Sequence, residues 1–397
     1  STSDIITNEA IADNLDANIF LGQEIIPYYV GQRLNSQIYS RVYQNIRNCN
    51  IVLDGLANDN TELGKTVKSA SYAIRGVSYF ELLKYYCLPV AGGVYPELGM
   101  PIVDYFDMEA RPVRSSYRET VEYIESNLIK ALELNSDDDL YIFTSDAVKF
   151  YLARLYFWTA QWNKAIEISE QLLSKYPILD RENYSQMVLG SRKFDNMIVR
   201  YKSGLVQDQY VVDRVYSSLR NRPVSIDFID IFDQPQNDIR LQLSVNALRN
   251  PIKLFIGALR SEELLLIAAE SYYYKGDNSK TVELLNLLRS KRINNYEPIT
   301  INSIPQTSAK SPIVKDAMNR ALTPLISLVI NERRKELFME GDRFMELKRL
   351  GSPEFWVSRN GLVYTTMEFM YTYPIPADDI ILNKGIIQNP GYTQFVD

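Results

Sequence analysis

The chain has 397 residues, of which 46% are hydrophobic and 23% are charged, as in an ordinary globular protein long enough to bury a large core. With 43 basic and 49 acidic residues the net charge is −6, so no basic surface for nucleic acid is indicated. The chain has no histidine, which excludes Ser-His and Cys-His nucleophilic pairs and histidine-ligated zinc.

The beginning of the chain suggests that a targeting segment has been removed. The first residues, STSDIITNEA, contain neither Met nor a signal peptide, so we expect a processed or trimmed chain. No apolar run in the sequence approaches the ~18 residues that a membrane-spanning helix needs.

Apolar residues that recur with a period of 3.6 predict helices for most of the chain. The first three cover residues 37–56, 65–86 and 116–134. Ser116 is the expected N-cap of the third, and Glu119 follows three residues later, which is the pattern of a capping box.

The later helices come in pairs. The same periodicity predicts helices over 146–160 and 164–175, over 261–274 and 279–291, and one long helix over 324–349. Strand-like pieces at 197–201 and 210–215 add a minor β content. The remaining stretches are irregular and hold most of the proline, which is typical of functional loops. They cover residues 1–36, 87–115, 178–260, 292–322 and 351–397.

The two cysteines do not decide the redox compartment. Cys49 shares an apolar stripe with Val42 and Ile46, so we expect it to pack as a small hydrophobic residue. A disulfide between Cys49 and Cys87 stays an alternative that the sequence cannot settle.

Two helix pairs carry the tetratricopeptide pattern of small and aromatic residues. In the first pair Ala153, Tyr156, Trp162, Ala165 and Pro177 fall at offsets 0, 3, 9, 12 and 24. The second pair fits the same frame with Ala269, Tyr272, Gly276, Thr281, Leu285 and Leu288. Because the two pairs begin 116 residues apart, far more than a tandem period of ~34, we expect helix pairs separated by large insertions.

Charged residues lie within the apolar stripe of the last predicted helix, where Arg333 and Glu340 are about two turns apart. Buried charges need partners, so we expect these ions to clamp the 373–392 tail through its carbonyls and carboxylates, and Gly341 to permit a close backbone approach. The alternative is a ligand-binding pair formed by Arg333 and Arg334. The structural motif comprises Arg333, Arg334, Glu340, Gly341 and Arg343.

The same segment resembles the ERR-EL-EG-R-DLKR helix of the SusD/RagB family, with Glu346 in place of the family's Asp. The closing YPIP at 373–376, Asn383 and QNPGY at 388–392 are similar to the family's last motif. More distant matches extend the resemblance over 37–392, although Gly76 replaces the usual Ala. The first match is Tyr43, Ile46 and Asn50, and the second is Arg75, Tyr79 and Phe80. The others are Tyr86 to Pro89, where the family's turn is altered, and Asp238 with Arg240.

The resemblance implies a mainly α fold, with tetratricopeptide-like helix pairs and a large irregular, insertion-rich side of minor β content. We therefore expect a single SusD-like domain over 1–397, with helical pairs near 37–86, 116–177, 261–291 and 324–350. It further implies a non-catalytic lipoprotein on the extracellular face of the outer membrane of Bacteroidetes, held by an N-terminal lipid anchor absent from this chain. Such a protein binds a glycan or related nutrient, with an oligosaccharide or polysaccharide as the expected ligand, and delivers it to a TonB-dependent transporter of the SusC type.

A sugar site needs exposed aromatic faces and a few polar groups. Trp158 and Trp162 lie within a helix pair and are expected in the core. The candidates in exposed loops are Trp356 and Arg359 late in the chain, Tyr28, Tyr29, Arg33 and Asn35 in the early loop, and Tyr210 and Tyr216 in the central insertion. For each, structural packing is the alternative.

No cofactor is expected. The run Asp137-Asp138-Asp139 lacks the spaced ligands of a calcium loop, so we expect these acidic side chains to be solvated and not to bind calcium. No phosphate-binding loop, dinucleotide fingerprint or nucleophile elbow occurs. Two other functions stay open: a tetratricopeptide-like scaffold that binds protein segments, and a glycoside-processing enzyme that uses paired carboxylates.

Overall fold

The computed structural model of the chain describes residues 34–107, 109–134, 143–190, 192–200, 223–253, 256–359 and 362–392. For 34–37, 356–359 and 362–366 it describes the backbone alone. Of these residues, those within Ile26–Ala160 and Glu368–Asp397 form one compact unit, called here the N-terminal unit, and those within Gln161–Met367 form the central unit. The single domain expected over 1–397 stays a prediction.

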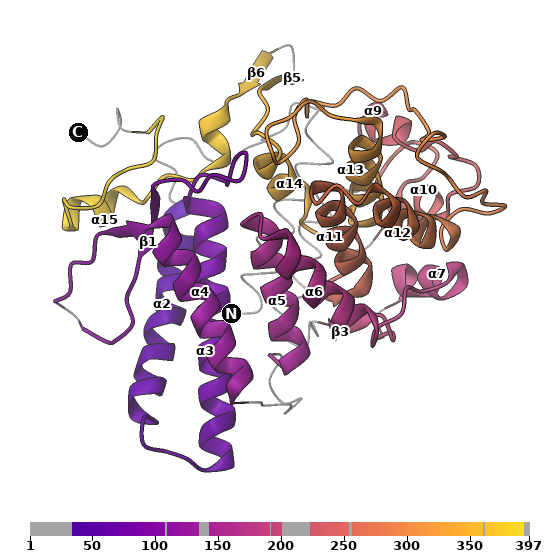
Figure 1. Cartoon of the computed structure of the whole chain (residues 1–397). Helices are drawn as coiled ribbons and strands as arrows, with labels where there is room; N and C mark the ends of the chain where they lie inside the picture. The colour runs from indigo at the N-terminus through magenta and orange to yellow at the C-terminus, as the bar shows by residue number, and fades with distance from the viewer. Residues whose placement is uncertain are drawn as a thin grey trace. The chain divides into compact units, whose positions relative to one another are not determined.

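The N-terminal unit is built on long helices that lie side by side, drawn from indigo to magenta in Figure 1. α3 packs against α2 and α4, and α4 packs against α5. Its elements are α2 (Leu34–Gly55), α3 (Glu62–Tyr86), β1 (Leu98–Pro101), β2 (Arg114–Ser116), α4 (Tyr117–Glu133), α5 (Ser145–Trp158), the 3-10 turn η1 (Glu368–Tyr371) and α15 (Ala377–Leu382). The helices predicted from periodicity in this part of the chain are confirmed.

Local contacts explain two features of this unit. The capping box of α4 is present, because Glu119 N donates to Ser116 Oγ at 3.1 Å and Ser116 N donates to the Glu119 carboxylate at 2.8 Å. A Cβ added at Gly76 would lie 3.0 Å from the side chain of Leu128. The glycine that replaces the family's usual alanine therefore lets α3 and α4 approach closely.

The 373–392 tail folds onto the end of α3 and onto β2. Asn389, which is 2% exposed, donates to the carbonyls of Tyr86 at 2.8 Å and Tyr373 at 2.7 Å. Arg114 donates to Asn389 Oδ1 at 2.7 Å. The closing motif thus completes the N-terminal unit, as Figure 1 shows for α15 beside β1.

In the central unit, α11 is the innermost helix and packs against α6, α12 and α13. Its residues from Ser261 to Ser271 are all buried, as expected of a helix covered on every side. Thr281, at a position where the repeat pattern expects a small residue, donates to the carbonyl of Ala269 at 3.0 Å and ties α12 to α11.

The elements of the central unit match the predicted helices at 164–175, 261–274 and 279–291 and the predicted strand at 197–201. Three short helices, α7, α9 and α10, interrupt the stretch that the sequence predicted as irregular, and the strand predicted at 210–215 lies outside the described residues. The bounds are α6 (Trp162–Leu173), α7 (Arg181–Leu189), β3 (Met197–Arg200), α9 (Ile226–Asp230), α10 (Ile239–Ser244), β4 (Ala258–Arg260), α11 (Ser261–Tyr274), α12 (Asn278–Ser290), α13 (Pro324–Glu336), α14 (Arg343–Arg349), β5 (Phe355–Arg359) and β6 (Leu362–Thr366).

The single helix predicted over 324–349 is wrong. α13 ends at Glu336 and α14 begins at Arg343. Between them Met339 has φ 62° and Gly341 has φ 84°, left-handed values that a continuous helix cannot contain. Glycine adopts this left-handed conformation without strain, which accounts for Gly341 at the break. The close backbone approach expected at Gly341 stays a prediction.

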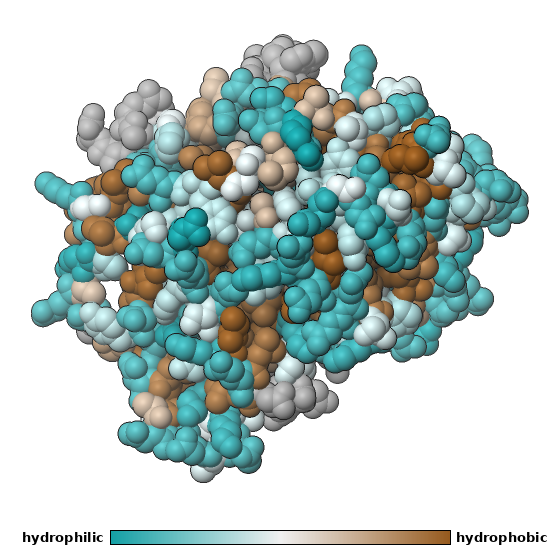
Figure 2. All heavy atoms as spheres, viewed as in Figure 1, coloured by the Kyte–Doolittle hydropathy of each residue, from teal (hydrophilic) through white to brown (hydrophobic). Residues whose placement is uncertain are grey.

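Hydrophobic residues reach the surface in small groups. On the face drawn in Figure 2 they form separate brown patches among hydrophilic residues. Among the described helices, none has the length and apolar character needed to cross a membrane.

Candidate ligand-binding site

The late candidates Trp356 and Arg359 both lie on β5, which pairs with β6 in an antiparallel hairpin. Trp356 is opposite Thr365, and Arg359 is opposite Leu362. The two late candidates therefore share one strand of the hairpin, three residues apart.

The other candidates are not tested. Tyr28, Tyr29 and Arg33 lie outside the described residues, as do Tyr210, Tyr216 and the run Asp137-Asp138-Asp139. Asn35 is in the first turn of α2, where only the backbone is described. These residues stay predictions.

The charged motif of α13 faces inward and binds basic side chains of the central unit. Glu332 accepts hydrogen bonds from Arg289 at 2.6 Å and from Lys335 at 2.8 Å. One turn further on, Glu336 accepts from Arg260 Nη1 at 2.8 Å and from Arg292 Nε at 3.0 Å. These side chains are all buried, so α13 is joined to β4 and α12 by ions that water does not reach.

The turn after α13 continues this set of contacts. Arg260 binds both carboxylate oxygens of Glu340 at 2.8 Å, and Lys253 donates to the same carboxylate at 2.7 Å. Arg333 donates through Nε to Asp342 at 2.7 Å, across the helix break. The partners described here for Glu340 and Arg333 thus lie at Lys253, Arg260 and Asp342, whereas the expectation was the 373–392 tail.

The pKa values reflect this arrangement. Burial would raise the pKa of Glu336, but the guanidiniums of Arg292, Arg260 and Arg240 outweigh burial and lower it. For Glu332 burial is likewise outweighed, by Arg240, Lys335 and Arg289, and its pKa falls well below the ordinary value. Both carboxylates are therefore held ionised, which suits an internal clamp and not proton transfer.

The alternative use of the motif as a ligand-binding arginine pair has one structural counterpart. Arg334 and Arg343 line a cavity of about 170 Å³ together with Lys310. Arg334 also lies over the ring of Phe228 at 5.5 Å, and Arg343 donates to Glu346 at 2.6 Å. The alternative stays a prediction.

The structure adds a candidate that sequence reasoning missed. Tyr105 and Phe106, adjacent in the 87–115 stretch, are 56% and 46% exposed. Two neighbouring aromatic residues on the surface are unusual enough to suggest a binding surface. Adjacent aromatics in a stretch already expected to carry function were the available sequence signal.

The segment that leads into Tyr105 is firmly anchored. Tyr43 donates to the carbonyl of Pro101 at 2.9 Å, Asn50 donates to Val103 O at 3.0 Å, and Val103 N donates to the hydroxyl of Tyr79 at 2.7 Å. Arg75 reaches the carbonyl of Asp104 at 3.3 Å. These four side chains are the family-like residues of α2 and α3, so the motif residues of these helices hold the base of the aromatic pair.

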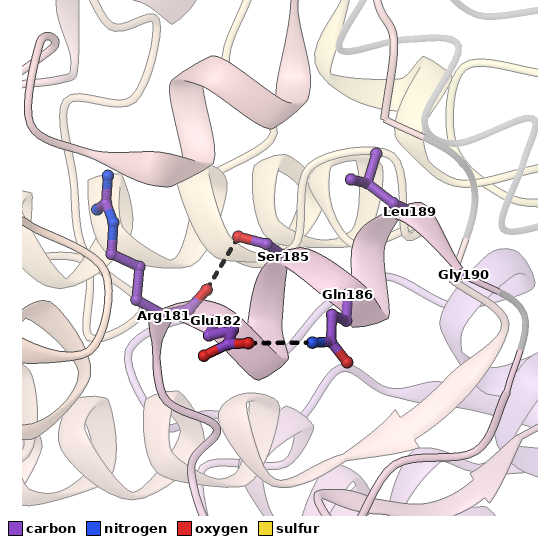
Figure 3. A pocket seen from close by; sticks show the side chains of 6 residues that line it. All are labelled: Arg181, Glu182, Ser185, Gln186, Leu189 and Gly190. Carbon is purple, nitrogen blue, oxygen red and sulfur yellow. Dashed lines mark hydrogen bonds between the residues drawn. The ribbon is translucent and has the colours of Figure 1, made fainter.

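A hollow on α7 of about 590 Å³ is a weaker candidate (Figure 3). Ser185 donates to the carbonyl of Arg181 at 2.9 Å, and the Gln186 amide donates to Glu182 at 3.4 Å. The side chains of Ser185, Gln186 and Glu182 thus make these hydrogen bonds along one helix. They do not converge on a common point, as the polar groups of a ligand site usually do.

The described residues contain no group of three or more Cys, Asp and Glu side chains that could hold a metal ion. Cys49 and Cys87 are both buried thiols that are not bonded to each other, so the possible disulfide is absent. Trp158 and Trp162 are buried as predicted, at 5% and 9% exposure.

Comparisons with known proteins agree with this architecture. Residues 1–157 match a SusD-like family model described as starch-binding and associating with the outer membrane, and residues 257–392 match the model of the SusD family. A tetratricopeptide model matches residues 147–177, which confirms the repeat pattern in the first helix pair. Among curated proteins, none matches this chain.

Solved structures share the fold. A SusD superfamily protein from Bacteroides thetaiotaomicron has a TM-score of 0.74 at 19% identity, and the match covers 98% of each chain. One from Bacteroides vulgatus has a TM-score of 0.74 at 18% identity, again over 98% of each chain. A laminarin-binding SusD-like protein has a TM-score of 0.60 at 16% identity, over 99% of each chain. The mainly α fold with minor β content is therefore confirmed.

Proposed function

Because the chain belongs to the SusD/RagB family, we propose that it binds a glycan at the cell surface without cleaving it and delivers the glycan to a TonB-dependent transporter of the SusC type. The support is the family model described as starch-binding and associating with the outer membrane. A structural relative is a laminarin-binding protein, which favours a polysaccharide as the ligand.

The exposed pair Tyr105 and Phe106 is the single observation that best supports a glycan surface. Aromatic rings offer flat apolar faces to the C–H faces of sugar rings, and the tyrosine hydroxyl offers a hydrogen bond at the edge. The pair follows a segment fixed to α2 and α3 by the hydrogen bonds of Asn50, Tyr79 and Arg75. A platform on a fixed base loses little conformational entropy when it binds.

Trp356 remains the second candidate platform, and Arg359 lies on the same strand. The other predicted contacts, from Tyr28, Tyr29, Arg33, Asn35, Tyr210 and Tyr216, belong to the same proposal.

The proposal places the protein on the extracellular face of the outer membrane, held by an N-terminal lipid. Delivery would be a movement of the binding protein against the transporter, with no bond broken in the glycan. Co-purification with a TonB-dependent transporter would support the partner. Recovery of the protein in a cell fraction free of outer membrane would contradict the location.

The test of the site is isothermal titration with a panel of polysaccharides that includes starch and laminarin. Tyr105→Ala and Phe106→Ala should each weaken the best ligand by roughly 1–3 kcal/mol, by analogy with stacking on nucleic-acid bases. Val94→Ala, which removes an apolar residue 71% exposed in the same stretch, is the matched control and should leave the affinity unchanged. Equal affinities for all three variants would exclude the aromatic pair.

The tetratricopeptide match over 147–177 favours one other function, a scaffold that binds protein segments. That function predicts a peptide or protein partner and no heat on titration with any polysaccharide. Binding of a polysaccharide that Tyr105→Ala weakens would decide against a scaffold with no small ligand.

A further inference from the structure

A second concave site lies in the central unit, where the turn between α11 and α12 meets the N-terminal end of α13. It is a pocket of about 330 Å³, lined among others by Tyr273, Asn278, Ile301, Arg320 and Pro324. This volume is at the lower end of the range of small-molecule sites, which is about 300–1,000 Å³. None of these residues belongs to the site proposed above.

Arg320 is held in one orientation although its side chain is 52% exposed. Asp316, itself 2% exposed, accepts from Arg320 Nε and Nη2, each at 2.9 Å. The same carboxylate accepts from the backbone N–H groups of Met318 and Arg320, each at 2.9 Å. Nη1 of Arg320 has no hydrogen-bond partner among the described residues. The pocket wall therefore carries a planar donor group that is already oriented.

Aromatic rings support this guanidinium. It lies 5.6 Å from the ring centre of Tyr273 and 5.5 Å from that of Tyr274. Tyr274 in turn stacks on the buried ring of Trp162, with centroids 4.4 Å apart. The hydroxyl of Tyr273 pairs with Thr323 Oγ1 at 2.9 Å, next to the first turn of α13. Arg320 is thus connected through the ring of Tyr274 to the buried ring of Trp162.

The lining also includes apolar residues. Ile301, which is 50% exposed, and the exposed Pro324 both belong to it. Apolar groups and oriented donors in one small pocket match a sugar ring, which has C–H faces and hydroxyl edges. Since the buried carboxylate of Asp316 balances the charge of Arg320, the pocket does not favour an anion over a neutral sugar.

We propose that this pocket is a second glycan subsite, which binds one ring of a neutral oligosaccharide through hydroxyl contacts to Arg320 and Asn278. The choice of a sugar as the ligand rests on the proposed function. The presence of the pocket does not depend on that function.

The experiment uses disaccharides, because a short probe cannot occupy both sites at once. Maltose and laminaribiose are titrated into the full chain, with binding followed by calorimetry and by ligand-observed NMR. Ile301→Arg places a large charged side chain in the pocket from a half-exposed position, so the fold should survive, which circular dichroism checks. Val314→Arg, at a residue 69% exposed that does not line the pocket, is the matched control.

The wild type and Val314→Arg should bind two equivalents of the better disaccharide. Ile301→Arg should bind one, and Arg320→Lys, which keeps the charge but loses the planar fork, should weaken that second site by about tenfold or more. Unchanged stoichiometry in Ile301→Arg would overturn the subsite, as would one equivalent in the wild type. Neither result would touch the proposed function, which the polysaccharide panel tests separately.

Discussion

The carboxylate of Glu336 accepts a hydrogen bond from Nε of Arg292 at 3.0 Å, and neither side chain exposes any surface to solvent. Arg260 binds the same carboxylate at 2.8 Å, so one glutamate of α13 holds together three segments of the central unit. Removing such a buried carboxylate is costly, because its buried basic partners stay charged without it.

Glu336→Gln should therefore destabilise the protein by roughly 3–5 kcal/mol, since the buried guanidiniums of Arg292 and Arg260 each lose one of their carboxylate partners. Denaturation in urea, followed by circular dichroism, measures the change. Glu283→Gln is the control: Glu283 pairs with Lys280 at 2.9 Å but its side chain is 63% exposed, so the loss should stay below about 1 kcal/mol. Equal losses for the two variants would mean that the buried cluster does not stabilise the fold.

Stability should fall in acid, and Glu336 should account for part of that fall. The pKa values of Glu336 and Glu332 are lower in the folded protein than their ordinary 4.5, so the unfolded chain binds more protons as the pH drops through 4.5 and below. Glu346 opposes this, because burial raises its pKa and its protonation favours the folded state. The urea midpoint measured from pH 7 to pH 3.5 should drop steeply in the wild type and less steeply in Glu336→Gln. A steeper drop in the variant would contradict the assignment.

Gly341→Ala should cost roughly 1–2 kcal/mol, because the residue has φ 84° and a side chain disfavours that conformation. Gly55→Ala is the comparison. Gly55 ends α2, and a Cβ there would meet no atom within 4 Å. Gly55→Ala should therefore leave the stability of the protein unchanged or raise it slightly. Thermal unfolding of both variants measures these changes. A Gly341→Ala variant as stable as the wild type would show that the break between α13 and α14 is not required.

Both thiols should resist labelling in the native protein. Cys87 is fully buried, and burial raises the pKa of Cys49 to about 11, so little thiolate forms at pH 8. Mass spectrometry after treatment with a maleimide should find no label without denaturant and two labels in urea. Rapid labelling of the native chain would contradict the burial of these residues, and a mass two hydrogens lower would reveal the disulfide that the structure lacks.

The long helices could be predicted because the signals that begin and end them are local. Ser116 and Glu119 are three residues apart and cap α4 by themselves. The break after Glu336 could not be predicted in this way. Leu337, Phe338, Phe344 and Leu347 are all buried across it, so the hydrophobic periodicity continues although the helix does not.

The charged motif was recognisable in the sequence, but its partners were not. Arg292 and Arg260 reach Glu336 from 44 and 76 residues away, and no local pattern marks a contact over that distance. The binding surface could not be predicted either, because the exposure of a residue depends on the tertiary structure. Tyr105 and Phe106 look like core residues in the sequence, and only the anchoring of residues 101–104 by α2 and α3 shows that the pair reaches the surface.

Binding without chemistry is tested most directly by one titration, in which the pure protein is mixed with each polysaccharide of the panel. Heat of binding and the chain length of the recovered glycan are measured in the same sample. Saturable binding of at least one polysaccharide, recovered at its original length, is the predicted result. A shortened glycan with new reducing ends would show an enzyme, and no binding to any polysaccharide would contradict the proposed function.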